Sequence, residues 1–235
     1  MLSALNTLAQ RARQQRWLHL VVVNLRFLIG FAFMPSGLKK VLGQPFTDPD
    51  KVGPFNDFLH AFHATGGFYR VVGVVQLTAA ILLLTQRFAT LGALMAVPIL
   101  TAIVALCWST AVYPTAVVVT LMSVATLGLL VWDIDKWRSV FRADRESVEP
   151  SPVATDSGVT AVLIEMGLWR GCGVAILVLY FAVCVLSGGV YRPRGVEFDQ
   201  PAFYLLPAIA LMPVVTWLIE RWRRRRARRD RAPGA

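Results

Sequence analysis

The segment NLRFLIGFAFMPSGLKK, residues 24–40, decides the fold class because it places an arginine inside a long apolar stretch. It continues the preceding WLHLVVV, so that an apolar run extends from Trp17 to Leu38. A run of this length can cross the hydrocarbon core of a bilayer as a helix. Arg26 lies nine residues after Trp17, which is about 13–14 Å along a helix axis. We therefore expect Arg26 near the middle of the membrane.

A charge at that depth costs at least about 2.5–3.5 kcal/mol even on the lower estimates, so some group must hold Arg26. Positions 26, 30, 33 and 37 share one helical face, and glycines at 30 and 37 suggest that this face packs against other helices. Gln76, midway along the second apolar run, is the leading candidate partner. Two interpretations remain open. Either Arg26 extends toward the cytoplasm or bonds carbonyl groups, or Arg26 and Gln76 face a polar pocket in the bundle.

The composition predicts an all-α integral membrane protein. Only 16% of the residues are charged and the mean hydropathy is +0.56, whereas about 25% of a soluble domain is charged. Apolar runs predict six spans, at 17–38, 68–86, 88–107, 113–131, 161–187 and 202–219. The first four form a bundle over 17–137, and the last two form an extension over 161–219. Residues 138–160, between them, lack an apolar period and are expected to be a solvated linker.

Lysines and arginines in the loops predict the orientation. With both termini inside, sixteen of these residues lie on the cytoplasmic side and six on the outer side, and eight of the sixteen are in the tail. Residues 1–16 and 220–235 are then cytoplasmic segments of a multi-pass protein of the inner membrane. A basic tail can also bind nucleic acid, but this one follows a span directly. We expect it to contact anionic lipid headgroups, with no nucleic-acid partner.

The outer end of the first span offers a second candidate site. Lys39 and Lys40 follow Ser36 there, where positive charge runs against the usual inside preference. They either contact headgroups or form a site for an anion or a quinone carbonyl. The outer loop then holds NDFLHAFHATGG, residues 56–67, which predicts a short amphipathic helix at the interface, capped by Asn56 and stopped by Gly66 and Gly67.

The remaining residues of interest are potential metal ligands, cysteines and small residues within the spans. Asp57, His60 and His63 stack at helical spacing but give at most three ligands, and no metal site is expected. The three cysteines lie in or beside apolar runs without a C-x-x-C motif, as buried small residues do. Small residues predict close helix approach, and they are Gly30, Gly37, Gly73, Ala80, Gly92, Ala96, Gly167 and Gly171.

Three stretches together resemble the DoxX family of membrane proteins. They are LRFLIGFAFMPSGLKKVLGQPF, GGFYRVVGVVQLTAAILLLTQRFATLGALMAVPIL and LLVWDIDKW, within residues 20–137. The residues that match the family pattern are Arg26, Gly30, Gly37, Lys39, Gly73 and Gln76. The resemblance implies a four-helix unit that acts with a membrane quinone or a redox partner. The two C-terminal spans depart from the usual four-helix form.

Three functions remain open from the sequence. The first is a membrane subunit of quinone-linked or redox-stress chemistry that acts with a partner protein. It has no intrinsic cofactor, and Arg26, Gln76, Lys39 and Lys40 contact the quinone. The second is a non-enzymatic membrane scaffold or assembly factor, since no catalytic constellation is present. The third is a small-solute transporter, for which only Pro207 and Pro213, expected to kink the sixth span, give a hint.

Overall fold

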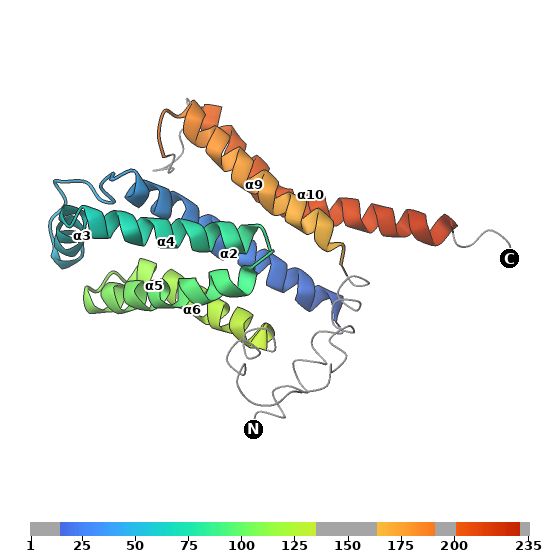
Figure 1. Cartoon of the computed structure of the whole chain (residues 1–235), viewed down its shortest axis with the longest axis horizontal. Coiled ribbons are helices and arrows are strands. Elements are labelled where there is room, and N and C mark those ends of the chain that lie inside the picture. Colours follow the sequence, from blue (N-terminus) through green and yellow to red (C-terminus); the bar gives the residue numbers. More distant parts are fainter. Residues whose placement is uncertain (1–14, 135–163, 191–200, 231–235) are drawn as a thin grey trace, which may run out of the picture. The chain divides into compact units, whose positions relative to one another are not determined.

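A computed structural model describes residues 15–134, 164–190 and 201–230 of the chain (Figure 1). Throughout these ranges the regular secondary structure is α-helical, without strands. The helices are α2 (Arg16–Val41), α3 (Pro54–Ala64), α4 (Gly67–Leu84), α5 (Ala89–Ser109), α6 (Tyr113–Trp132), α9 (Met166–Leu186) and α10 (Pro201–Asp230). The linker 138–160 and residues 135–137, the end of the predicted bundle, lie outside the described residues.

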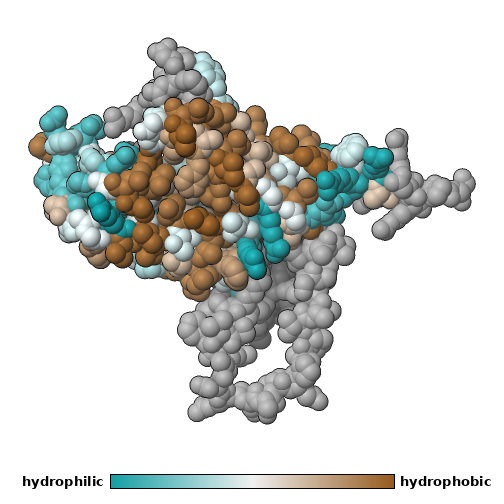
Figure 2. All heavy atoms as spheres, turned by 45° about the horizontal axis from the view of Figure 1, so that its top comes forward, coloured by the Kyte–Doolittle hydropathy of each residue, from teal (hydrophilic) through white to brown (hydrophobic). Residues whose placement is uncertain are grey.

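Six of these helices are long and apolar enough to cross a membrane: α2, α4, α5, α6, α9 and α10. They coincide with the six apolar runs of the sequence, so the protein is an all-α, multi-pass membrane protein. Many large apolar side chains on their outer faces are exposed, for example Leu121 at 64% and Val178 at 61%. These faces form the brown surface of Figure 2, and contact with lipid is the environment that suits them.

The chain divides into two compact units, and the boundary falls within α2. Residues 25–145 form one unit, which holds most of α2 together with α3, α4, α5 and α6. Residues 1–24 and 146–235 form the other, in which the first turns of α2 are grouped with α9 and α10. We refer to them as the four-span unit and the hairpin unit.

In the four-span unit, glycines allow close contact between neighbouring helices. A Cβ on Gly73 of α4 would lie 2.5 Å from the Lys40 Cβ and 2.8 Å from the Val41 backbone nitrogen of α2. A Cβ on Gly30 would lie 2.9 Å from Leu84 Cγ, and one on Gly92 would lie 3.0 Å from the Ala79 oxygen. The predicted close approaches at these glycines are therefore confirmed. Gly167 and Gly171 of α9 face open space among the described residues, and that prediction is wrong.

The loop between α2 and α4 contains α3, as the amphipathic pattern predicts, but the helix begins earlier than expected. It starts at Pro54 after Gly53, because proline is already set in a helical φ and needs no backbone donor at the first position. Asn56 is therefore inside the helix, where its side chain accepts a 2.8 Å hydrogen bond from Thr47 Oγ1. The helix stops before Gly66, whose positive φ of 57° turns the chain into α4.

Helix α10 continues through both of its prolines, to Asp230. Pro207 and Pro213 thus lie inside an unbroken helix rather than at an interruption. The Arg-rich tail was predicted to begin after the last span. Its residues up to Asp230 instead continue α10 as helix. The interrupted helix that a transporter site would use is not found at these prolines.

Candidate functional site

Arg26 is held by residues from three other segments of the four-span unit. Its Nη1 donates to Gln86 Oε1 at 3.1 Å, and its Nη2 pairs with Asp133 Oδ2 at 2.5 Å. Thr90 Oγ1 donates to the same carboxylate oxygen at 3.0 Å. The arginine is 6% exposed and the aspartate 2%. We call Arg26, Gln86, Thr90 and Asp133 the Arg26 cluster.

The partners of Arg26 in this cluster lie at the ends of helices. Gln86 is in the turn between α4 and α5, Thr90 is in the first turn of α5, and Asp133 follows the last residue of α6. Short turns between spans lie where the chain leaves the hydrocarbon. The ends of α4 and α6 at the level of Arg26 thus favour a position nearer the end of the spans than the count from Trp17 predicts.

The predicted pairing of Arg26 with Gln76 is wrong. Gln76 lies ten residues before Gln86 on α4, which is about 15 Å along the helix. The actual anion, Asp133, is separated from Arg26 by 107 positions in the chain. In the sequence, Asp133 lies in WDIDKW, directly after the fourth apolar run. An acid beyond the end of a span is not an evident partner for an arginine within another span.

A second polar cluster lies near the other end of α2. Lys40 Nζ donates to Gln76 Oε1 at 3.0 Å and to the Ser36 carbonyl at 3.2 Å. Gln76 Nε2 in turn donates to Ser36 Oγ. The Lys40 ammonium lies 4.9 Å from the centroid of the Phe46 ring, within the range of a cation–π contact. We call Ser36, Lys40, Phe46 and Gln76 the Lys40 cluster.

The close packing of α2 on α4 positions this cluster. Gly73 is one turn before Gln76, and its missing side chain lets the backbone of α4 approach the Cβ of Lys40. Gly37 meets Leu77 in the same way, with a built Cβ 3.0 Å from the Leu77 nitrogen. Lys40 and Gln76 are consequently buried, at 9% and 2% exposure. A lysine and a glutamine side chain thus share a site with little access to water.

The four predicted site residues do not form a single site. Lys40 and Gln76 come together, whereas Arg26 belongs to the separate cluster at the opposite part of α2. Lys39 is half-buried, and it is turned from Lys40 by the angle of about 100° between successive helical residues. Of the four residues, the structure thus brings Lys40 and Gln76 together.

The two histidines of α3 hold the loop between α2 and α3 in place. A ring nitrogen of His63 lies 3.0 Å from the Gly43 carbonyl oxygen, and one of His60 lies 3.1 Å from that of Asp48. Tyr69 Oη of α4 donates to the Gln44 carbonyl at 2.8 Å. These bonds fasten the loop that carries Phe46 to the start of α4. Within the described residues, no group of three potential metal ligands gathers here or elsewhere.

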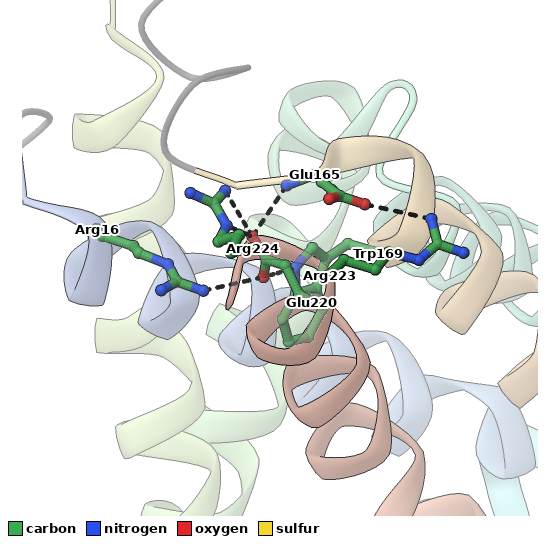
Figure 3. A network of polar contacts seen from close by, with 6 residues as sticks. All are labelled: Arg16, Glu165, Trp169, Glu220, Arg223 and Arg224. Carbon is green, nitrogen blue, oxygen red and sulfur yellow. Dashed lines mark hydrogen bonds and ion pairs between the residues drawn. The ribbon is translucent and has the colours of Figure 1, made fainter. Parts of the chain in front are cut away.

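The hairpin unit contains a buried acid that the sequence analysis did not single out. Glu220 of α10 is 0% exposed, and it accepts from the Glu165 backbone N–H and from Trp169 Nε1, each at 3.1 Å (Figure 3). Arg224 lies 2.8 Å from one of its carboxylate oxygens and Arg16 lies 3.4 Å from the other. Glu220 thus ties the start of α9 to α10. In the sequence, Glu220 is distinguished as the one acid within the run IERWRRRR, residues 219–226.

The chain was compared with protein families, curated proteins and solved structures. No family model, no curated protein and no solved structure matches the chain. The fold and the two polar clusters therefore define the class directly, a helical membrane protein with six candidate spans and buried polar groups between its helices.

Proposed function

We propose that the chain is a DoxX-like membrane subunit that binds a quinone headgroup at the Lys40 cluster and works with a redox partner protein. The observation that supports this most is the 3.0 Å bond between Lys40 and Gln76, because it joins two residues singled out for such a site. In this proposal the subunit lies in the inner membrane with both termini in the cytoplasm. A partner supplies the electrons, and the bound quinone accepts them.

The chemistry of the Lys40 cluster suits a quinone. A quinone headgroup is a flat ring with carbonyl oxygens that accept hydrogen bonds, and it becomes more negative on reduction. Lys40 and Gln76 carry N–H donors in a site shielded from water, where charge-assisted hydrogen bonds are strong. The Phe46 ring beside the ammonium offers an aromatic face to the headgroup.

The loop over the cluster provides a route of entry. Phe46 lies in the stretch between α2 and α3, which contains turns and bends but no regular helix. Displacing Phe46 from Lys40 would break their cation–π contact, a contact of about 0.5–2 kcal/mol, among others. The quinone tail would then lie along the apolar outer faces of α2 and α4.

Equilibrium binding of decylubiquinone to the purified full-length protein in detergent tests this function. We expect saturable binding that Lys40→Met and Gln76→Leu each weaken about tenfold, the effect of losing one good hydrogen bond in a shielded site. Phe46→Ala should weaken binding without removing a buried charge.

Lys51→Met is the matched control, since Lys51 is an exposed lysine of the same outer loop, and it should bind like the wild type. Circular dichroism and size-exclusion chromatography would show that each variant is folded. If the wild type binds no quinone, or if Phe46→Ala and Lys40→Met bind as well as Lys51→Met, the proposal is wrong.

A scaffold function is the second candidate, supported by the Arg26 cluster. Its ion pair joins α2 to the end of α6 and to the turn between α4 and α5, so the buried charges act to fix the bundle. A purified complex that holds a stoichiometric protein partner and no redox molecule would favour this function over quinone binding.

A further inference from the structure

Four arginines near the end of α10, Arg221, Arg223, Arg224 and Arg225, differ in their contacts. Arg224 pairs with the buried Glu220, and Arg223 lies 3.5 Å from Glu165 (Figure 3). Arg221 and Arg225 are exposed, and neither forms an ion pair with any residue that the structure describes. The first group is engaged within the hairpin unit, and the second is exposed, with no acidic partner among the described residues.

Arg221 and Arg225 border a hollow with two apolar side chains. Together with Leu218 and Trp222 they line a depression of about 290 Å³ on α10. Trp222 is 59% exposed and Leu218 is 51% exposed. A pair of guanidinium groups one helical turn apart can bind a phosphate through several charge-assisted hydrogen bonds.

An apolar groove lies next to this hollow in the same unit. It has a volume of about 190 Å³ and is lined by Leu20, Asn24, Trp169, Pro213, Val214 and Trp217. The Arg221 guanidinium lies 5.2 Å from the centroid of the Trp217 ring, so Trp217 connects the groove to the arginines. Val214 and Arg221 are about 10 Å apart along the helix axis. Over this distance the residues along α10 change from apolar to cationic.

The apolar part of α10 ends near this site. The backbone of Glu165, directly before α9, is bonded to Glu220 of α10, so α10 extends beyond the start of α9 from about that residue onward. Figure 2 shows the same change, from brown over the helices to teal toward the C-terminal end of α10. Arg221 thus lies where the charged residues of α10 begin, and Val214 lies about two helical turns earlier, in the apolar part of the helix.

We propose that the hairpin unit binds one anionic phospholipid at a defined site. Its phosphate lies between Arg221 and Arg225, and one acyl chain lies in the groove along Trp217 and Val214. This differs from a general attraction of the basic tail to an anionic membrane, because the site needs two particular arginines and an apolar groove. The inference is independent of the quinone proposal, which concerns the other unit.

Native mass spectrometry of the full-length protein, titrated with dioleoylphosphatidylglycerol, tests the site. We expect the first lipid to bind about tenfold more tightly than dioleoylphosphatidylcholine, and Arg221→Ala/Arg225→Ala to remove that preference. Val214→Trp, which fills the groove at a half-exposed position without changing charge, should weaken phosphatidylglycerol binding severalfold. Glycerol 3-phosphate at equal concentration should not displace the lipid.

The matched control is Arg87→Ala/Arg223→Ala, which removes the same charge outside the site and should change the first binding step by less than about threefold. Equal losses in the two double variants, or unchanged binding in Val214→Trp, would show diffuse electrostatic attraction and overturn the proposal. Displacement by glycerol 3-phosphate would also overturn it, since the acyl chain would then contribute nothing.

Discussion

At the scale of single residues, the cost of burying a charge explains the Arg26 cluster. Arg26 and Asp133 have side chains that are 7% and 3% exposed, and they neutralise each other at 2.5 Å. The Nε–H of Arg26 is buried without a hydrogen-bond partner among the described residues, so the aspartate carries much of the compensation. Removing one partner leaves the other charge buried and unpaired, which is far more unfavourable than removing both.

We therefore predict that Asp133→Leu lowers the free energy of unfolding by about 3–5 kcal/mol, and that Arg26→Leu/Asp133→Leu lowers it much less. Unfolding by titration with a denaturing detergent, followed by circular dichroism, measures both values. As a control, Glu165→Gln breaks a pair that is 36% and 53% exposed and should cost less than about 1 kcal/mol. A double variant as unstable as the sum of its singles would contradict the pairing.

At the scale of helices, close packing rather than amphipathicity holds the four-span unit together. Membrane helices gain little from burying apolar side chains, since lipid is equally apolar, and they depend on contact and hydrogen bonds. Gly73 allows close contact and hydrogen bonding together. Its missing side chain lets α4 approach α2, and this approach brings Gln76 within hydrogen-bond distance of Lys40.

Gly73→Ala should therefore destabilise the protein by about 1–3 kcal/mol, or force α4 away from α2, because its Cβ would meet the backbone of Val41. The same unfolding titration measures this change. Gly128→Ala, at an exposed glycine of α6 with open space around its Cβ, should be nearly neutral. Equal effects of the two substitutions would show that the α2–α4 contact is not a tight one.

At the scale of the whole molecule, the apolar runs predict the spans well because their lengths match the membrane thickness. The run at 113–131 becomes α6 at Tyr113–Trp132, and the run at 68–86 becomes α4 at Gly67–Leu84. The ends are less predictable where an apolar or helix-forming sequence continues past the membrane. This is the case at Trp17, before the four-span unit, and at Glu220, within α10.

The polar contacts were much harder to predict from the sequence than the spans. The Arg26 and Asp133 pair depends on which helix ends lie at one level, and no local pattern encodes that. Lys40 and Gln76 were both singled out, but their contact depends on the glycine packing of α2 against α4. A buried polar side chain can be suspected from sequence, whereas its partner is set by how the helices pack.

The orientation of the whole chain remains a prediction from its charges, and cysteine labelling can test it. Cys107, Cys172 and Cys184 are buried, so their background reaction should be low. We expect Lys51→Cys to react with an impermeant maleimide in intact spheroplasts, and Ala227→Cys to react only after lysis, since both positions are exposed in the structure. The reverse pattern would place the basic tail outside.

The most direct test of the quinone-binding function is native mass spectrometry of the protein extracted from its own membrane in mild detergent. We expect an added mass equal to that of the membrane's quinone, retained in Arg26→Leu/Asp133→Leu and lost in Lys40→Met. Retention in Lys40→Met, or loss in the Arg26 cluster variant alone, would contradict a site at the Lys40 cluster. The absence of any quinone from the wild-type protein, with a stoichiometric protein partner in its place, would contradict quinone binding and favour the scaffold.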